Sequence, residues 1–467
     1  MEDRPLHYQT IAHVSEMLAS REITSVDLTR HLLDRIEALD GQLKSYATVM
    51  TERAIESAER ADREIVSGKI RGPLHGVPIA VKDLCFTKGV STMGGSQVLS
   101  DHVPEYDGTV VRKLKAAGAV LLGKLNLTEG AMGGYSPAFD APLNPWASDR
   151  WAGASSSGSG AATSAGLCFG SLGSDTGGSI RFPAAACGTV GLKPTWGRVS
   201  RYGILPLAES LDHVGPLTRS VADAGIVLQA IAGQDLNDPT SLSDAVPDML
   251  ANLNRGVGGI RLGFDERYVT QDIDPEMAAS VVDAIKVLEG LGAELVEVEL
   301  PNMDPYVDAW KILCSAEAVA AHRKTYPLRR KDYGPWFRDW LDLGASITAA
   351  EYAEANTLRL ESNGHVRRVL HDIDILVCPS MSAPAHPVTR EILYGPLPED
   401  RVARFQRFTA PFDYSGSPTL SIPTGLSNDG IPLSLQLVGK HLSEPLLIRV
   451  GHSYEKTTNW PNPPDFS

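Results

Sequence analysis

Two stretches rich in glycine and serine constrain this 467-residue chain more than any other feature of its sequence. The first covers residues 151–160 and reads WAGASSSGSG; the second covers residues 173–183 and reads GSDTGGSIRFP. Between them lie small apolar residues (161–172), which predict a buried helix that runs into a buried strand. Dense glycine costs chain entropy, and it usually serves close backbone approach, a positive φ, or N–H groups that face a ligand.

The residue types alone leave three interpretations of these clusters open. They can be loops without chemistry. A phosphate-binding loop is disfavoured, because neither cluster is followed by Lys-Ser/Thr; residues 118–124 (GAVLLGK) come near that motif, but Leu125 then stands where it needs Ser or Thr. The third interpretation is a serine nucleophile whose oxyanion is held by successive amide N–H groups, each worth about 2.7–4 kcal/mol of barrier.

A serine nucleophile needs a base, and the candidates in this chain are few. No histidine lies near either cluster; His213, in the segment SLDHVG, is interpreted as a turn histidine. Lys82 ends the apolar, strand-like run GVPIAVK. Burial would lower the pKa of this lysine and supply the neutral amine that a base must be, although a surface lysine fits the same residues when they are read alone.

Several motifs together resemble the amidase signature family, most closely over residues 70–230. They are VPIAVKD around Lys82, the two clusters, CGTVGLKPTWGRVS (187–200) and LDHVGPLTR (211–219). The resemblance implies a Ser–cis-Ser–Lys triad, with Lys82 as the base, Ser155 as the bridging serine and Ser179 as the nucleophile. It also implies that the oxyanion-hole amides belong to Thr176, Gly177, Gly178 and Ser179.

The chain departs from the family at the bridging serine, where the usual motif is GGSSGGS. Ala154 and Ser157 replace two of those glycines, and we still expect a cis peptide bond between Ala154 and Ser155. The resemblance places further residues at the site, although a plain turn also fits residues 130–136. Met132, Gly133 and Ser156 are expected beside the substrate, and Ser156, Asp175, Arg181 and Asp83 are expected to support the loop geometry.

The implied mechanism is acyl transfer. Ser179 attacks a carbonyl carbon, and its proton passes through the Ser155 hydroxyl to neutral Lys82 and then to the leaving amine. Water hydrolyses the resulting acyl-enzyme. Because activity should fall as Lys82 becomes protonated, this hypothesis predicts a neutral-to-alkaline optimum.

Strand-like runs alternate with helical segments along the chain, which predicts an α/β fold: one large domain over residues 1–467, with a mixed central sheet covered by helices on both faces. Within it we expect an N-terminal helical segment (1–65), the signature core (70–230) and a variable region over the active-site mouth (303–410). Residues 303–371 are predicted to be helical and are rich in aromatic residues. A solvated helix face with a few core aromatics is the alternative for that region.

Composition narrows the partners and the compartment. A formal net charge of −14 disfavours a nucleic-acid partner. Five widely spaced cysteines without zinc-ligand spacing predict reduced thiols in a cytoplasm, with no metal and no cofactor. The sequence contains no run of eighteen apolar residues, so it predicts no membrane span. The charged first residues do not resemble a signal peptide. The family resemblance also allows a homodimer.

The sequence therefore predicts a stand-alone amidase that cleaves a C–N bond of a small carboxamide, anilide or related carbonyl compound, carbamates and esters included. The alternative is the glutaminase component of a tRNA-dependent amidotransferase, which would act with partner subunits. A catalytically inactive binding protein is disfavoured, because all three triad positions are filled.

Overall fold

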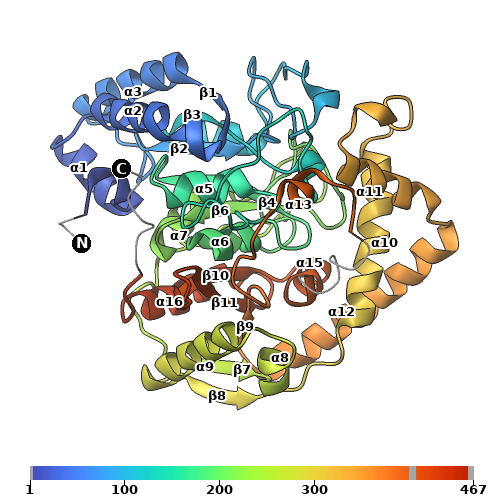
Figure 1. The fold of residues 1–467 in the computed structure, drawn as a ribbon. Helices are drawn as coiled ribbons and strands as arrows, with labels where there is room; N and C mark the ends of the chain where they lie inside the picture. Colours follow the sequence, from blue (N-terminus) through green and yellow to red (C-terminus); the bar gives the residue numbers. More distant parts are fainter. Residues whose placement is uncertain (1–3, 399–405, 461–467) are drawn as a thin grey trace.

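The computed structural model describes residues 4–398 and 406–460 of the chain. Within these ranges, eleven strands form one sheet in the order β1-β3-β2-β4-β6-β5-β10-β11-β9-β7-β8 (Figure 1). The strands are β1 (Tyr46–Val49), β2 (Pro78–Lys82), β3 (Val120–Leu125), β4 (Gly170–Asp175), β5 (Val190–Lys193), β6 (His213–Thr218), β7 (Arg261–Phe264), β8 (Glu294–Glu297), β9 (Ile375–Pro379), β10 (Thr419–Leu426) and β11 (Pro432–Gly439).

The sheet is mixed, as predicted. β2 lies between β3 and β4 and runs parallel to both, with Val81 opposite Leu172 of β4. From β4 across to β9 every neighbouring pair is antiparallel, and β7 then pairs in parallel with β8 and β9. Every residue of β2 and β4 is buried, which is why both strands read as apolar or small runs in the sequence.

Helices cover both faces of the sheet, in agreement with the predicted α/β class (Figure 1). Their bounds are α1 (Ile11–Ser20), α2 (Ser25–Leu43), α3 (Thr51–Val66), α4 (Thr109–Ala116), α5 (Ser157–Ser164), α6 (Arg181–Cys187), α7 (Val221–Ile231), α8 (Glu266–Thr270), α9 (Pro275–Gly290), α10 (Asp304–Ala321), α11 (Pro335–Ser346), α12 (Ala349–Asp372), α13 (Arg390–Tyr394), α15 (Ala410–Tyr414) and α16 (Glu444–Glu455). The short 3-10 turns η3 (Glu129–Ala131) and η5 (Gln406–Phe408) also border the site described below.

Two local expectations are wrong. The N-terminal segment is not helical throughout, because β1 lies between α2 and α3 and pairs antiparallel with β3. His213 is not in a turn: it begins the buried strand β6, where it lies opposite Asp175 of β4. In both cases pairing with a distant strand decided the conformation, and the local residue types gave no sign of it.

The predicted helical region consists of α10, α11 and α12, which stand together at one end of the molecule (Figure 1). Trp310, Phe337 and Trp340 are almost completely buried there, and they belong to the same hydrophobic core as the strands of the sheet. Residues 399–405, which belong to the predicted 303–410 region, lie outside the described residues.

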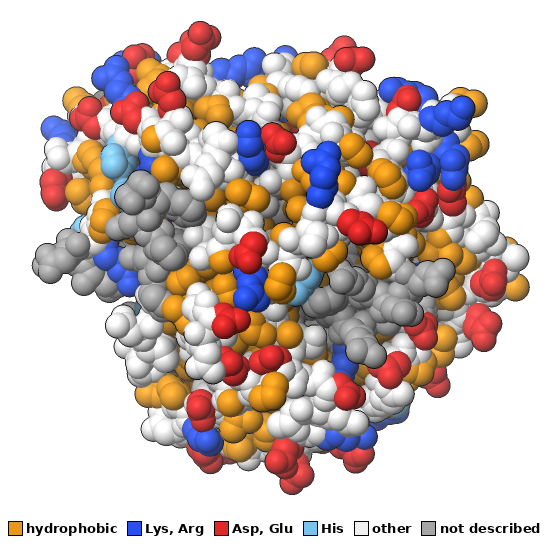
Figure 2. Space-filling view, viewed as in Figure 1, with side chains coloured by type: hydrophobic (Ala, Val, Ile, Leu, Met, Phe, Trp, Pro, Cys, Tyr) orange, Lys and Arg blue, Asp and Glu red, His pale blue; other side chains and the backbone are white. Residues whose placement is uncertain are grey.

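Charged side chains lie on the surface, and the cysteines lie in the interior. On the face shown in Figure 2, acidic and basic side chains are interspersed and neither sign dominates. All five cysteines are buried and unpaired. No helix in the described ranges combines the length and the apolar character needed to cross a bilayer.

Candidate active site

Lys82 ends β2 with its side chain completely buried. Its Nζ lies 2.6 Å from Ser155 Oγ and 2.9 Å from the Oγ atoms of both Ser156 and Ser174. Burial lowers the pKa of this lysine to about 7, even though the nearby carboxylate of Asp175 acts in the opposite direction. A neutral amine is therefore available near pH 7 and above.

Ser155 belongs to the loop that leads into α5, and the Ala154–Ser155 peptide bond is cis. The Ser155 carbonyl accepts a hydrogen bond from the Thr128 amide at 3.2 Å, which joins this loop to the loop of η3. Ser155 itself is fully buried, whereas its neighbour Ala154 is only partly buried. Ser155 therefore follows directly after a residue, Ala154, that lines a cavity.

Ser179 occupies the turn between β4 and α6. It is partly exposed, although the residues on either side of it are buried. Gly178 has a φ of 132°, and a Cβ at that position would come 2.4 Å from the Phe182 ring, so only glycine fits before the serine. Ser179 and Ala154 both line one cavity of about 150 Å³, which brings the two catalytic loops to the same space.

Asp175 fixes the shape of the Ser179 turn from below. Its carboxylate accepts hydrogen bonds from the amides of Gly178 (2.6 Å) and Ile180 (2.9 Å). It also accepts two from the Arg181 guanidinium, at 3.0 and 2.8 Å. Burial alone would raise the pKa of Asp175, but the adjacent Arg181 outweighs it and holds that pKa below its usual value. The predicted supporting positions of Asp175 and Arg181 thus meet in one buried ion pair.

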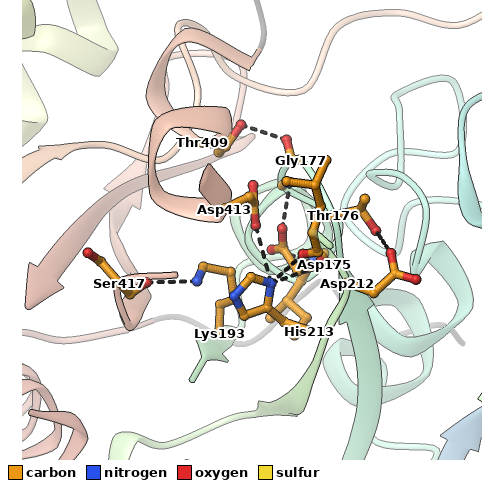
Figure 3. Close-up of polar contacts among 12 residues, drawn as sticks. Asp175, Thr176, Gly177, Lys193, Asp212, His213, Thr409, Asp413 and Ser417 are labelled. Atoms are coloured by element: carbon orange, nitrogen blue, oxygen red, sulfur yellow. Dashed lines mark hydrogen bonds and ion pairs between the residues drawn. The ribbon is translucent and has the colours of Figure 1, made fainter. Parts of the chain in front are cut away.

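A second layer lies behind this pair, and sequence reasoning missed it. Arg181 Nη2 donates to Asp413 Oδ2 of α15 at 2.6 Å. His213 Nδ1 lies 3.6 Å from Asp413 Oδ1 (Figure 3). Lys193 Nζ donates to the Ser417 carbonyl at 2.7 Å, and burial lowers the pKa of this lysine to about 8. Asp413 stands more than two hundred residues beyond Arg181 in the chain, so no local motif pointed to it.

The predicted oxyanion donors divide into two groups. The amides of Thr176, Gly177 and Ser179 donate to no acceptor in the described part of the chain, so they are free to face a ligand. Gly178 differs from the prediction, because its amide already donates to Asp175. Two other residues hold the carbonyls of this turn. Trp310 Nε1 donates to Thr176 O at 2.8 Å. Thr409 Oγ1 donates to Gly177 O at 2.6 Å (Figure 3).

The cavity beside Ser179 is walled mainly by aromatic and aliphatic groups. Its lining comprises Met132, Gly133, Gly134, Trp151, Ala154, Thr176, Gly177, Ser179, Phe182, Leu207, Trp310, Trp336, His386, Ile392, Pro398 and Gln406. Among these described residues there is no carboxylate, lysine or arginine. The cavity can therefore hold a small uncharged group against the serine.

Only some of the remaining predicted site residues line this cavity. Met132 and Gly133 line the cavity, as the resemblance implied. Ser156 does not line it: its hydroxyl lies beside Lys82 and donates to the Ser174 carbonyl at 3.2 Å. Asp83 is buried in an ion pair with Lys124 (2.9 Å) and accepts from the Met93 amide, so it supports a neighbouring loop.

The described residues were also compared with the side-chain groups that a metal ion needs. No group of three or more His, Cys, Asp or Glu side chains within residues 4–398 and 406–460 could hold a metal ion. The chemical groups that do converge are a hydroxyl, an amine with a lowered pKa and free amide donors. These are the parts of acyl transfer by a serine nucleophile.

Comparisons with known proteins identify the family to which the chain is similar. A family model described as Amidase matches residues 27–448. The predicted amidase AmiD of Mycobacterium tuberculosis is 46% identical over 453 residues, which cover 96% of this chain and 94% of that protein. A glutamyl-tRNA(Gln) amidotransferase subunit of Geobacter sp. (strain M21) is 40% identical and covers 97% of both chains. The peptide amidase of Stenotrophomonas maltophilia is similar in structure, with a TM-score of 0.87, 32% identity and coverage of 99% of both chains.

Proposed function

The chain belongs to the amidase signature family and is a hydrolase that acts on amides, and we propose that it works alone, on a small uncharged carboxamide or anilide. Ser179 is the proposed nucleophile, Ser155 the bridging serine and Lys82 the base. A carbamate or an ester that fits the cavity would react through the same acyl chemistry. The observation that carries the proposal is the 2.6 Å contact between the buried Lys82 amine and Ser155, whose neighbour Ala154 lines the same cavity as Ser179.

In the proposed reaction, Ser179 Oγ attacks the carbonyl carbon of the substrate, and its proton moves to Ser155 Oγ while the Ser155 proton moves to Lys82 Nζ. The tetrahedral oxyanion is held by the free amides of the Ser179 turn. Collapse of this intermediate breaks the C–N bond, and the proton returns through Ser155 to the departing amine. Water then attacks the acyl-enzyme by the same route, which releases the acid and restores Ser179.

The second candidate is a glutaminase that works with partner subunits, favoured by the 40% identity to the Geobacter amidotransferase protein. Free glutamine carries an ammonium and a carboxylate, and both need charged or strongly polar partners when they leave water. The described lining of the cavity offers no carboxylate, lysine or arginine to either group. This lining supports an uncharged substrate over glutamine.

Turnover by the purified chain, alone, tests the proposal at pH 7 and pH 9. The panel holds primary aliphatic amides, anilides, an aryl carbamate, a p-nitrophenyl ester and glutamine, with Ser179→Ala as the control. We expect cleavage of neutral amides or anilides by the wild type, none by the variant, and glutamine at least about a hundredfold less efficient. Glutaminase activity that appears only when amidotransferase partner subunits are added would instead favour the second candidate.

A further inference from the structure

The peptide group between Thr176 and Gly177 is held at its carbonyl by a residue of α10. Trp310 Nε1 donates to Thr176 O at 2.8 Å. The Thr176 side chain adds a second anchor, because its Oγ1 donates to Asp212 Oδ1 at 2.6 Å (Figure 3). The Thr176–Gly177 peptide bond is trans, and in a planar trans peptide group the N–H points away from the C=O. The hydrogen bond from Trp310 therefore also sets the direction of the Gly177 N–H.

The next two N–H groups of the turn differ in whether they are free. The Gly178 N–H is already used, since it donates to Asp175 Oδ1 at 2.6 Å. The Gly178 carbonyl accepts from the Phe182 amide at 2.7 Å, which orients the peptide group that Gly178 shares with Ser179. The Ser179 N–H, on the other side of that peptide group, donates to no acceptor in residues 4–398 and 406–460.

Gly177 and Ser179 thus supply two amide donors that are both oriented and free. Both residues line the cavity, and like the Ser179 amide, the Gly177 amide donates to no acceptor in the described part of the chain. The two lie two residues apart, and the nucleophile supplies one of them, which is the arrangement of the amide donors in chymotrypsin-like hydrolases. The Ser179 donor is oriented by the start of α6 beside it, whereas the Gly177 donor is oriented by Trp310, more than a hundred residues away.

Close packing fixes the Trp310 ring against the turn. A Cβ on Gly177 would come 2.4 Å from that ring, so a larger residue could not let the indole approach the peptide this closely. Trp310 is only 1% exposed, and its ring centroid lies 6.0 Å from that of Trp340. An indole packed on both sides has little freedom to turn, so its N–H keeps one direction.

From these contacts we infer that Trp310 is a positioning residue of the reaction. Its indole N–H orients the Thr176–Gly177 peptide group, so that the Gly177 and Ser179 amides bind the oxyanion together. The inference rests on the proposed function and adds to it a residue from outside the catalytic motifs. An oriented donor acts on charge that develops in the transition state, so loss of its orientation should lower kcat and leave KM little changed.

Two matched substitutions separate the hydrogen bond from packing. Trp310→Phe removes the N–H and keeps an aromatic ring. Trp340→Phe is the control: Trp340 is also almost completely buried, but its Nε1 donates to no acceptor in the described ranges. Both variants therefore lose the same ring volume, and only one loses a hydrogen bond. Trp310→Leu, which also lacks the N–H, repeats the measurement so that poor folding of one variant cannot decide the result.

A tetrahedral inhibitor adds a readout that packing alone would not change. When phenylboronic acid binds, Ser179 Oγ forms a bond to boron, and the Ser179 proton passes through Ser155 to Lys82. The boron becomes a tetrahedral anion, which places an oxygen at the position of the oxyanion. Benzyl alcohol has a similar ring but forms no tetrahedral centre, so it reports binding to the cavity alone. Inhibition constants of both compounds are measured at pH 7, beside kcat and KM for a neutral amide that the wild type cleaves.

For Trp310→Phe we expect kcat to fall about ten- to a hundredfold, since loss of a whole oxyanion donor typically costs about 10²–10³-fold. KM and the inhibition constant of benzyl alcohol should change by less than about threefold, whereas that of phenylboronic acid should rise by the factor by which kcat falls. Trp340→Phe should lower the melting temperature as a core truncation does, and leave all four kinetic quantities within about twofold of wild type.

Different results would overturn the inference and the proposed function. If Trp310→Phe and Trp310→Leu keep kcat and the affinity for phenylboronic acid, the inference fails and the proposed function stands. The same conclusion follows if Trp340→Phe lowers kcat as much as Trp310→Phe does, because packing of the helices would then be the cause. If the wild type cleaves no amide and Ser179→Ala binds phenylboronic acid equally well, the proposed function fails and the inference fails with it.

Discussion

Two parts of the chain form most of the cavity wall, and they differ in what they add to it. Residues 76–218, which we call the catalytic half, hold the proposed triad of Lys82, Ser155 and Ser179 through buried hydrogen bonds and an ion pair. This half also contributes apolar side chains to the wall: Met132, Trp151, Phe182 and Leu207. Residues 304–398, which we call the helical half, contribute rings and aliphatic side chains: Trp310, Trp336, His386, Ile392 and Pro398. The proposed chemistry depends on groups that cannot shift, whereas selection among uncharged substrates depends on shape. The catalytic half therefore serves both tasks, and the helical half serves the second.

The two halves meet through many polar contacts, and two of these lie close to the site. Trp310 Nε1 donates to the Thr176 carbonyl, and the Gly334 amide donates to Glu129 at 2.7 Å. Glu129 also accepts from Ser96 Oγ at 2.6 Å, and burial raises the pKa of its carboxyl to about 7. The position of the helical half over the Ser179 turn therefore depends on the side chains of Trp310 and Glu129.

The largest effect should come from the catalytic half at Ser179. Ser179→Ala removes the proposed nucleophile, and we expect kcat to fall by at least about 10⁴-fold on every amide. Stability should change by less than about 0.5 kcal/mol, because the Ser179 side chain is partly exposed and makes no hydrogen bond to a described residue. Steady-state kinetics and thermal melting measure the two quantities. Full activity in the variant would mean that the triad is assigned to the wrong serine.

The next largest effect should come from Asp413, which binds Arg181 beneath the Ser179 turn of the catalytic half. Asp413→Ala leaves the buried Arg181 with one carboxylate fewer, and removing one partner of a buried pair typically costs about 3–5 kcal/mol. Urea unfolding measures the loss. Asp283→Ala, in an exposed pair with Lys286, is the matched control and should cost less than about 0.5 kcal/mol. Equal losses in the two variants would show that the buried network is not what holds the turn.

The pH profile should show which buried group of the catalytic half controls activity. The Lys82 amine, with a pKa near 7, is an active base only when neutral, so kcat/KM should fall about tenfold per pH unit below 7 and approach a plateau above it. Glu129→Gln removes a second group whose pKa lies near 7, and the midpoint should stay where it was. A maximum near pH 5, or a midpoint that moves with Glu129→Gln, would remove Lys82 from the role of base.

The smallest effect should belong to the helical half. A Cβ on Gly133 would come 2.7 Å from the Trp336 ring, so Gly133→Ala should displace that ring and narrow the cavity. We expect KM for aromatic amides to rise about three- to tenfold, with acetamide and the pH midpoint unchanged. Gly364→Ala, where nothing lies within 4 Å of the added methyl, serves as the control. Loss of activity on acetamide as well would mean that Trp336 also shapes the catalytic turn.

The catalytic half was largely predictable from sequence, because its signals are local. The apolar run ending at Lys82 became β2, and the small residues after Ser156 became α5 and β4. The short edge strand β1 was missed, since its partner is β3, more than seventy residues further along the chain. The start of α2 (Ser25–Leu43), by contrast, has a local signal, because the Thr24 side chain accepts from the Asp27 amide and caps the helix.

The groups that hold the site from outside could not be predicted in the same way. Trp310 and Thr409 fix the carbonyls of the catalytic turn from more than a hundred residues away, and Asp413 reaches Arg181 from α15. Nothing in the neighbourhood of these residues in the sequence distinguishes them from an ordinary core aromatic, a turn threonine or a surface carboxylate. Only the packing of α10 and α15 against the turn reveals them.

Three hydroxyls lie around the Lys82 amine, and the direction of their hydrogen bonds depends on whether the lysine is charged. An ammonium has three hydrogens to give, whereas a neutral amine has two and one lone pair. Ser156 gives its own hydrogen to the Ser174 carbonyl, so the hydrogen that enters the lone pair must come from Ser155 or Ser174. When Lys82 takes up a proton, that hydroxyl turns its hydrogen away from the amine. The proposed relay moves the Ser179 proton through Ser155 to Lys82, so turnover should show a solvent isotope effect that involves more than one proton.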